Sequence, residues 1–207
     1  MKKMPYSKKW QKLLTEFYDV AASENFVINA QAIYEKLCSL YVNRKPSNQQ
    51  TVLYSRILPG LSIYKALCAE NHDQNKVLDE VEVLFKRTFF TNQLQGILLL
   101  NYFSNPFPVI KPVLKLMTDK EYLPDSQEVI VDNKDCFAIN IYRCFILDVL
   151  SENNAKELTY LYCKTDDWLA EALPKISWER TKTLGRGDDC CDFRWSSVQK
   201  SAPNKAF

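Results

Sequence analysis

The sequence is poor in the residue on which many catalytic chemistries depend. Among its 207 residues there is a single histidine, His72, which lies in a polar stretch between two helical patterns. A Ser–His–Asp triad, a Cys–His dyad and a histidine-rich metal site would all have to recruit it. We expect His72 on a surface loop, so acid–base chemistry is expected to use Asp, Glu, Cys, Tyr or Lys side chains.

Glycine is also scarce, with four residues, and this excludes the common phosphate-binding loops. Neither GxGxxG nor GxxxxGK occurs, so the sequence offers no dinucleotide-binding turn and no P-loop. No cofactor and no metal site is expected. The net charge is only +2, and lysines gather only in Met1–Lys12, so nucleic acid is not an expected partner.

Long apolar runs are missing as well. The longest, Ile97–Leu100, is far too short to cross a bilayer, which takes about 20 apolar residues. No apolar segment of the kind found in secretion signals follows Met1–Lys12. We therefore expect a cytoplasmic protein without membrane association, whose seven cysteines, an odd number, are free thiols. Formation of a homo-oligomer is left open.

The sequence does contain enough apolar residues for a packed core, since 46% of it is hydrophobic and 25% charged. Residues 1–124 form the predicted helical region, where apolar positions recur at helical spacing. The predicted helices are Lys8–Val20, Ala30–Val42, Gln50–Glu70, Lys76–Gly96 and Val109–Met117. Pro59 predicts a kink or a new helix start, because proline lacks a backbone donor and clashes with the preceding turn.

Residues 125–196 follow a different pattern. Glu128–Val131 is a short apolar run and Cys136–Tyr142 alternates, which predicts two strands. Short helices are predicted over Cys144–Leu150 and Asp166–Leu173. The predicted fold class is therefore α+β: a helical region, then a small antiparallel sheet of about three or four strands with helices packed on it. We expect both parts to pack as one domain, and residues 197–207 to form a flexible tail.

The segment Ser177–Trp195 predicts a hairpin that closes the sheet. Alternating residues lead into a turn containing Gly185 and Gly187 and return as CDFRW. A purely structural hairpin needs none of the chemistry-bearing side chains gathered here, which are Arg180, Arg186, Asp188, Asp189, Cys190, Cys191, Asp192 and Arg194.

Strand alternation assigns these side chains to two faces. Cys191, Phe193 and Trp195 share the predicted core face, and Cys190, Asp192 and Arg194 share the other. Because Cys190 and Cys191 point in opposite directions, they are poor joint ligands for one zinc ion.

Arg180 shares its predicted face with Ile176 and Trp178, which places a guanidinium on the inner side. A buried arginine must be paired. Arg180 is therefore expected either in an internal ion pair, with Asp166 or Asp192 as partner, or at the end of a cavity that binds an anionic ligand.

Three thiols are each followed closely by a carboxylate, in the pairs Cys144 with Asp148, Cys163 with Asp166, and Cys191 with Asp192. A thiolate attacks an electrophilic carbon while a carboxyl group moves protons. A carboxylate also raises the pKa of a nearby thiol, so an arginine or a helix N-terminus would have to offset it. Two other interpretations of these cysteines are open. Either they are buried apolar residues, or all three thiols hold one metal ion.

Four segments, in this order, resemble the L-2-amino-thiazoline-4-carboxylic acid hydrolase family. They are ILPGLSIYKAL (Ile57–Leu67), IYRC (Ile141–Cys144), CKTDD (Cys163–Asp167) and ERTKTLGRGDDCCDFRW (Glu179–Trp195). The residues on family motif positions are Cys144, Cys163, Asp166, Gly187, Cys191, Asp192 and Phe193. The resemblance implies an enzyme that opens a cyclic isothiourea to N-carbamoyl-L-cysteine, a step toward cysteine.

The residues and the resemblance together favour a hydrolase acting on a small cyclic amidine or thiazoline carboxylate. The catalytic candidates are Cys144, Cys163, Asp166, Cys191 and Asp192, and the substrate-binding candidates are Arg180 and Arg194. We expect the three thiols to converge on one pocket. The glycine–acid–cysteine–aromatic turn also resembles the four-vinyl reductase type of small-ligand domain, so the alternative is a non-catalytic binding or sensor domain.

Overall fold

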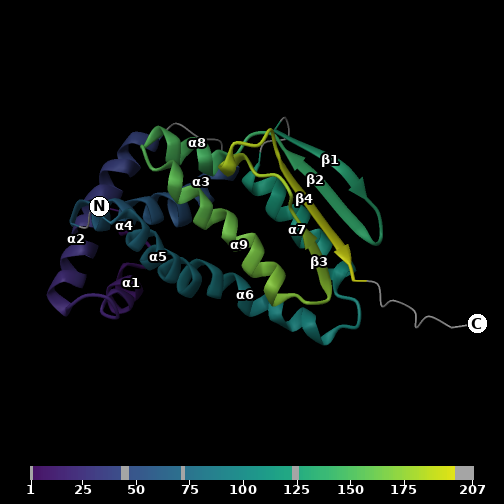
Figure 1. Ribbon diagram of the computed structural model, residues 1–207, viewed down its shortest axis with the longest axis horizontal. Helices are drawn as coiled ribbons and strands as arrows, with labels where there is room; N and C mark the ends of the chain where they lie inside the picture. Colours follow the sequence, from purple (N-terminus) through teal and green to yellow (C-terminus); the bar gives the residue numbers. More distant parts are fainter. Residues whose placement is uncertain (1, 43–46, 71–72, 123–125, 199–207) are drawn as a thin grey trace, which may run out of the picture. The chain divides into compact units, whose positions relative to one another are not determined.

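The computed structural model describes residues 2–42, 47–70, 73–122 and 126–198, and His72 lies outside this part of the chain. Its contacts divide into two compact units, which are described separately. Unit 1 consists of Met1–Gln93 and Cys144–Asp166, and unit 2 of Leu94–Arg143 and Asp167–Phe207. The fold is α+β, as predicted, with helices first and a small antiparallel sheet after them (Figure 1).

The regular secondary structure of unit 1 is helical in its described residues. Its helices are α1 (Ser7–Leu14), α2 (Val20–Tyr41), α3 (Ser47–Val52), α4 (Leu58–Glu70), α5 (Gln74–Phe85), α8 (Phe145–Glu152) and the first part of α9 (Thr159–Ala172). Two five-residue π-helices interrupt the pattern, η1 (Leu53–Ile57) before α4 and η2 (Lys86–Phe90) after α5. The 3-10 turn η5 (Lys156–Leu158) leads into α9.

Local chemistry explains where several predicted helices differ from the observed ones. The helix predicted over Lys8–Val20 ends at Leu14. The next helix, α2, starts at Val20, ten residues before the predicted Ala30, because the Asp19 side chain accepts a hydrogen bond from the Ala22 amide and caps the helix there. The helix start expected near Pro59 is confirmed, since α4 begins at Leu58.

Two other predictions also needed correction. The helix predicted over Lys76–Gly96 is broken by η2 and resumes as α6 (Thr91–Ile97). Helix α9 begins at Thr159 rather than Asp166, so Cys163 lies inside a helix. The seven cysteines are free thiols, as predicted.

Unit 2 is built on a four-stranded antiparallel sheet in the order β1-β2-β4-β3. The strands are β1 (Gln127–Asp132), β2 (Cys136–Ile141), β3 (Ile176–Glu179) and β4 (Cys191–Ser197), which confirms the predicted hairpin. The register shifts between Val129 and Val131 in the edge strand β1. From residue 199 onward, the predicted tail lies outside the described residues.

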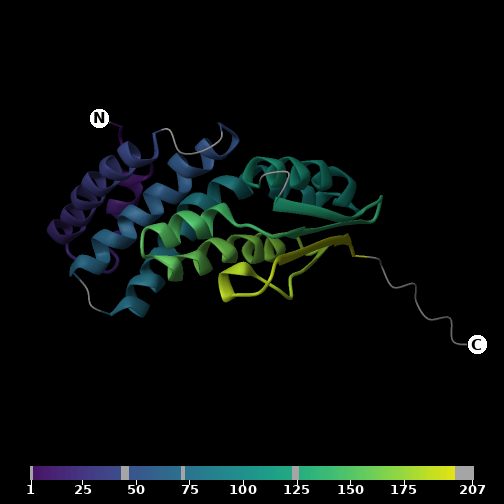
Figure 2. The same cartoon turned by 90° about the horizontal axis from the view of Figure 1, so that it is seen from above.

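One face of the sheet carries the core of unit 2. Helix α7 (Phe107–Glu121), which extends beyond the predicted Val109–Met117, covers this face (Figure 2). Phe107, Ile110 and Leu114 of α7 pack on the inward residues of the strands. Those residues are Phe137, Ile139, Ile141, Ile176, Cys191, Phe193 and Trp195, so the predicted core face of the last strand is confirmed. In the described part of the chain, every helix is too short or too polar to cross a bilayer.

Candidate active site

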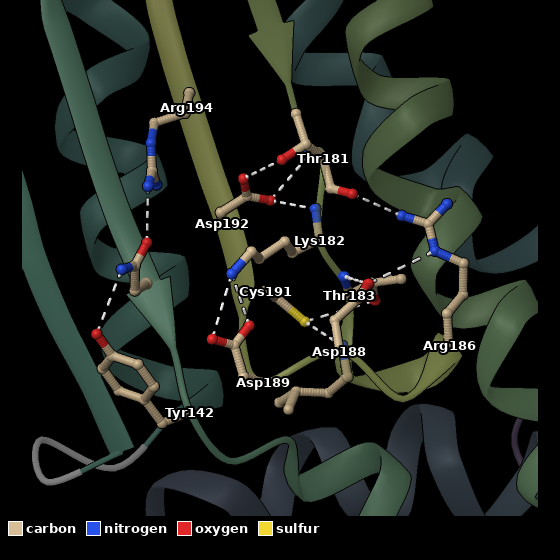
Figure 3. Close-up of polar contacts among 12 residues, drawn as sticks. Tyr142, Thr181, Lys182, Thr183, Arg186, Asp188, Asp189, Cys191, Asp192 and Arg194 are labelled. Atoms are coloured by element: carbon tan, nitrogen blue, oxygen red, sulfur yellow. Dashed lines mark hydrogen bonds and ion pairs between the residues drawn. The ribbon is translucent and has the colours of Figure 1, made fainter.

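The loop between β3 and β4 holds most of the polar side chains singled out in the sequence (Figure 3). A 3-10 turn, η6 (Leu184–Arg186), is followed by Gly187, whose φ of 97° lies in the left-handed region that favours glycine. The Asp188 carboxylate accepts a hydrogen bond from the Thr183 amide at 2.7 Å and closes this turn. The family-motif glycine therefore has a local structural role.

Asp192, on β4, is held by the loop segment that follows β3. Its carboxylate accepts hydrogen bonds from the Thr181 amide (2.8 Å), the Thr181 hydroxyl (2.6 Å) and the Lys182 amide (2.6 Å). Burial alone would raise the pKa of Asp192, but these hydrogen bonds outweigh it and hold the pKa below its usual value. Asp192 is thus an ionised carboxylate near neutral pH, suited to orienting groups and not to donating a proton.

Because its ionised form is the hydrogen-bonded one, Asp192 links stability to pH. Stability from a lowered carboxylate pKa is present above the unfolded value, about 3.9, and is lost as the pH falls through the folded value. We expect Asp192→Asn to lower the free energy of unfolding at pH 7 by about 1–2 kcal/mol and to flatten the acid limb of a urea-unfolding series. Asp79→Asn, on the exposed surface of α5, is the matched control and should leave that limb unchanged.

Cys191 points to the opposite face from Asp192 and enters the core. Its side chain is buried, and its sulfur accepts a hydrogen bond from the Leu184 amide at 3.3 Å. The Thr183 hydroxyl lies 3.5 Å from the same sulfur. The loop therefore holds the Cys191 thiol in one position, while the Asp192 carboxylate lies on the other face of the strand.

Cys190 differs from Cys191 in its surroundings. Burial, followed by the negative charge of Asp189, raises the pKa of the Cys190 thiol. Asp189 is itself held by Lys182, whose ammonium lies 2.9 Å from its carboxylate and lowers the pKa of that carboxyl group. Cys190 is accordingly a protonated thiol at neutral pH, which makes it a poor nucleophile.

Arg194 extends from β4 over the sheet face that carries Asp192. Its guanidinium donates to the carbonyls of Ile139 (2.8 Å) and Phe193 (2.9 Å) and to the Asn140 side-chain oxygen (2.7 Å). Asn140 in turn donates to the Tyr142 hydroxyl at 3.3 Å. Within the described residues, the hydrogen-bond partners of the Arg194 guanidinium are thus neutral oxygens.

Arg180 follows the end of β3 and forms an internal ion pair, one of the two outcomes expected from strand alternation. One guanidinium nitrogen lies 3.0 Å from both carboxylate oxygens of Asp167, and the Arg180 side chain is 10% exposed. The Trp178 indole donates to the same carboxylate at 3.2 Å, and its ring lies 5.8 Å from the guanidinium carbon. The prediction that Asp192 pairs with Arg180 is wrong, because the Asp192 carboxylate accepts hydrogen bonds from the loop amides instead. Asp167 was not among the predicted partners.

This pair leads to a stability prediction for Arg180→Lys. Lysine cannot reproduce the planar contacts with Asp167 and Trp178. We expect about 1–2 kcal/mol of stability to be lost, which lowers the Tm by about 3–6 °C in a chain of this size. Differential scanning calorimetry measures this, and Arg87→Lys, in an exposed pair with Glu16, is the control. A raised KM with an unchanged Tm would instead indicate that Arg180 anchors a ligand.

The remaining catalytic candidates lie in unit 1. Cys144 is the residue before α8, at the end of the segment that follows β2, as the sequence predicted. Cys163 and Asp166 are one helical turn apart on α9 and are both partly exposed. The convergence of Cys144, Cys163 and Cys191 on one pocket stays a prediction. Among the described residues, no group of three or more His, Cys, Asp and Glu side chains is arranged to hold a metal ion.

A surface hollow of about 760 Å³ lies at the other end of the sheet from the β3–β4 loop. Its lining includes Asn133, Cys136 and Ser196, and it contains no predicted site residue. It is an open feature, and the two charged residues of its lining, Lys134 and Asp135, lie 3.9 Å apart as an exposed ion pair.

Comparison with known protein families shows to which family the chain belongs. A family model described as L-2-amino-thiazoline-4-carboxylic acid hydrolase matches residues 50–195, most of the chain. The chain belongs to this family. Membership supports a hydrolase-type function in general. No curated protein and no solved structure matches the chain significantly.

In unit 1, a residue of the first motif segment contacts the residue just before the Cys163–Asp167 motif, which the sequence did not reveal. Gly60 of the first segment lies against Tyr162, the residue before the Cys163 motif. A Cβ on Gly60 would lie 2.3 Å from the Tyr162 hydroxyl and 2.6 Å from Cζ of Phe85. The glycine at position 60 was the only sign of a close contact in the sequence. That the contact is with Tyr162 is seen only in the folded chain.

Proposed function

We propose that the chain is a hydrolase that opens a small cyclic amidine or thiazoline carboxylate of the L-2-amino-thiazoline-4-carboxylate type. The observation that carries the proposal is the family match over residues 50–195. The side chains support it, because the ordered motifs supply thiols, carboxylates and arginines where histidine is almost absent. The proposed reaction needs a small-molecule substrate and no cofactor.

The chemistry of such a substrate calls for these groups. Water adds to the amidine carbon, the bond from that carbon to the ring sulfur breaks, and the two protons of water end on the ring nitrogen and on the released sulfur. A carboxylate such as Asp166 would hold the amidinium cation and make its carbon more electrophilic. A thiolate or an activated water would then attack that carbon, with Cys163 or Cys191 as the proposed thiol.

Arg194 is the better of the two arginines for the substrate carboxylate. Arg180 is already neutralised by Asp167. Arg194 contacts neutral oxygens within the described residues, so an anionic ligand would gain a charge-assisted hydrogen bond there.

The second candidate is a non-catalytic domain that binds a small ligand. The observation that favours it is the burial of Cys191, whose side chain is 6% exposed within the hydrophobic cluster of unit 2. A thiol in such a place lines a core and meets substrate only if the loop moves.

The test is a turnover assay with purified protein. The substrate is L-2-amino-thiazoline-4-carboxylate, and release of the free thiol is followed with a chromogenic disulfide reagent, with the carbamoyl product identified by mass spectrometry. Turnover supports the hydrolase. Folded protein that binds members of a panel of cyclic amidines without consuming them would support the binding domain instead.

A further inference from the structure

Cys163 lies between two anchored residues on α9. On one side, the Tyr162 hydroxyl contacts the backbone carbonyls of Arg56 at 3.1 Å and Ile57 at 3.3 Å, donating to them. On the other side, the Lys164 ammonium lies 2.6 Å from the Glu82 carboxylate. The helix is therefore held to η1 and to α5 by the two immediate neighbours of the thiol.

The two carbonyls that Tyr162 contacts belong to the last two residues of the π-helix η1, close to Pro59. Pro59 has no backbone N–H, so the helix cannot make its usual bond back to residue 55. Widened turns of this type occur where a helix is interrupted, and they are frequent at functional sites. The Tyr162 hydroxyl donates to the two carbonyls that follow residue 55, and so fastens α9 to the interrupted part of the helix.

The neighbours of the tyrosine leave it little freedom. Tyr162 is 3% exposed, and its ring packs on Phe85 with centroids 5.0 Å apart. Gly60 admits the hydroxyl, since any larger residue would clash with it. Burial raises the pKa of Tyr162 above the ordinary value of a tyrosine, and the charge of Arg56 opposes this with a smaller effect. The hydroxyl therefore stays protonated and able to donate a hydrogen bond.

We propose that Tyr162 is the positioning residue for Cys163: its bonds to η1 set the rotation and height of α9, and thereby the direction in which the thiol is presented. Helical spacing extends this effect to Asp166, which lies one turn after Tyr162 on the same side of the helix. The inference rests on the proposed role of Cys163 in the hydrolase. It assigns a role to Tyr162 and to its contact with η1, and it explains why the first motif has a glycine at position 60.

The test replaces Tyr162 with phenylalanine, which keeps the ring and removes the hydroxyl. We expect kcat to fall about fivefold or more, with KM within about twofold of the parent value. Alkylation of Cys163 by iodoacetamide, followed by peptide mass spectrometry, should change in rate by about threefold or more, with Cys136 as the internal reference. Tyr102→Phe, at a side chain that is 87% exposed, should change neither.

A merely structural tyrosine would give a different result. In that case Tyr162→Phe would lower the Tm, but at temperatures well below the Tm kcat and the alkylation rate of Cys163 would stay unchanged. That result would overturn the inference. Glu82→Gln, which weakens the second anchor, provides an independent variant with the same expected change at Cys163. Because alkylation needs no turnover, parent protein without activity would count against the proposed function alone.

Discussion

Cys163→Ala and Cys191→Ala are each expected to lower turnover of L-2-amino-thiazoline-4-carboxylate by about tenfold or more while the fold survives. Both thiols lie in segments of the hydrolase family model, and both are placed by their neighbours: Cys163 between two anchored residues of α9, Cys191 beneath the Leu184 amide. Steady-state kinetics measures the effect, with circular dichroism and the Tm as checks on folding.

Cys136→Ala is the matched control, because this thiol is partly exposed and lies at the start of β2, outside the proposed site. Cys191→Ser is a useful companion, since it keeps the size of the side chain in the core of unit 2. If both alanine variants retain full turnover, catalysis by Cys163 or Cys191 is wrong, and Cys144 or an activated water with Asp166 as its partner would have to do the chemistry.

The second large effect is expected at Gly60. Gly60→Ala should lower the free energy of unfolding by about 3 kcal/mol or more, because the new methyl group would displace the Tyr162 hydroxyl and the Phe85 ring together. The clash involves a buried ring and a buried hydroxyl, both packed into the helices of unit 1, so neither is able to move away cheaply. Urea unfolding measures the loss.

Gly96 is a well-matched control. It lies in the helix α6, and a Cβ there meets nothing within 4 Å. Gly96→Ala should therefore raise the stability by about 0.5–1 kcal/mol through helix propensity. The double variant Gly60→Ala with Tyr162→Phe should recover part of the loss, and a complete absence of recovery would show that Phe85 alone carries the clash.

The sheet could be predicted closely because its physical signal is local. Alternation along Cys136–Ile141 and Cys191–Ser197 assigns each side chain to a face, and burial of Cys191, Phe193 and Trp195 follows directly. The pairing of Trp178 with Trp195 in β3 and β4 places these two aromatic residues opposite each other, with ring centroids 4.7 Å apart.

The details of the site could not be predicted in the same way. Asp166 and Asp167 are adjacent carboxylates, and no local pattern in the sequence indicates that Asp167 pairs with Arg180. Helix α9 itself starts earlier than predicted, because the turn before it is a 3-10 segment without a strong sequence signal. The contact between Gly60 and Tyr162 joins residues that are far apart in the chain, so no local pattern carries it.

The shape of the two outer strands has a consequence for how copies of this protein meet in concentrated solution. An exposed strand edge offers free backbone groups on which another chain can add a strand and begin a fibril. In this sheet one edge, β1, breaks register between Val129 and Val131, and the other, β3, has only four residues. Both edges are therefore poor templates for fibril growth, and we expect the folded protein to resist strand-by-strand aggregation.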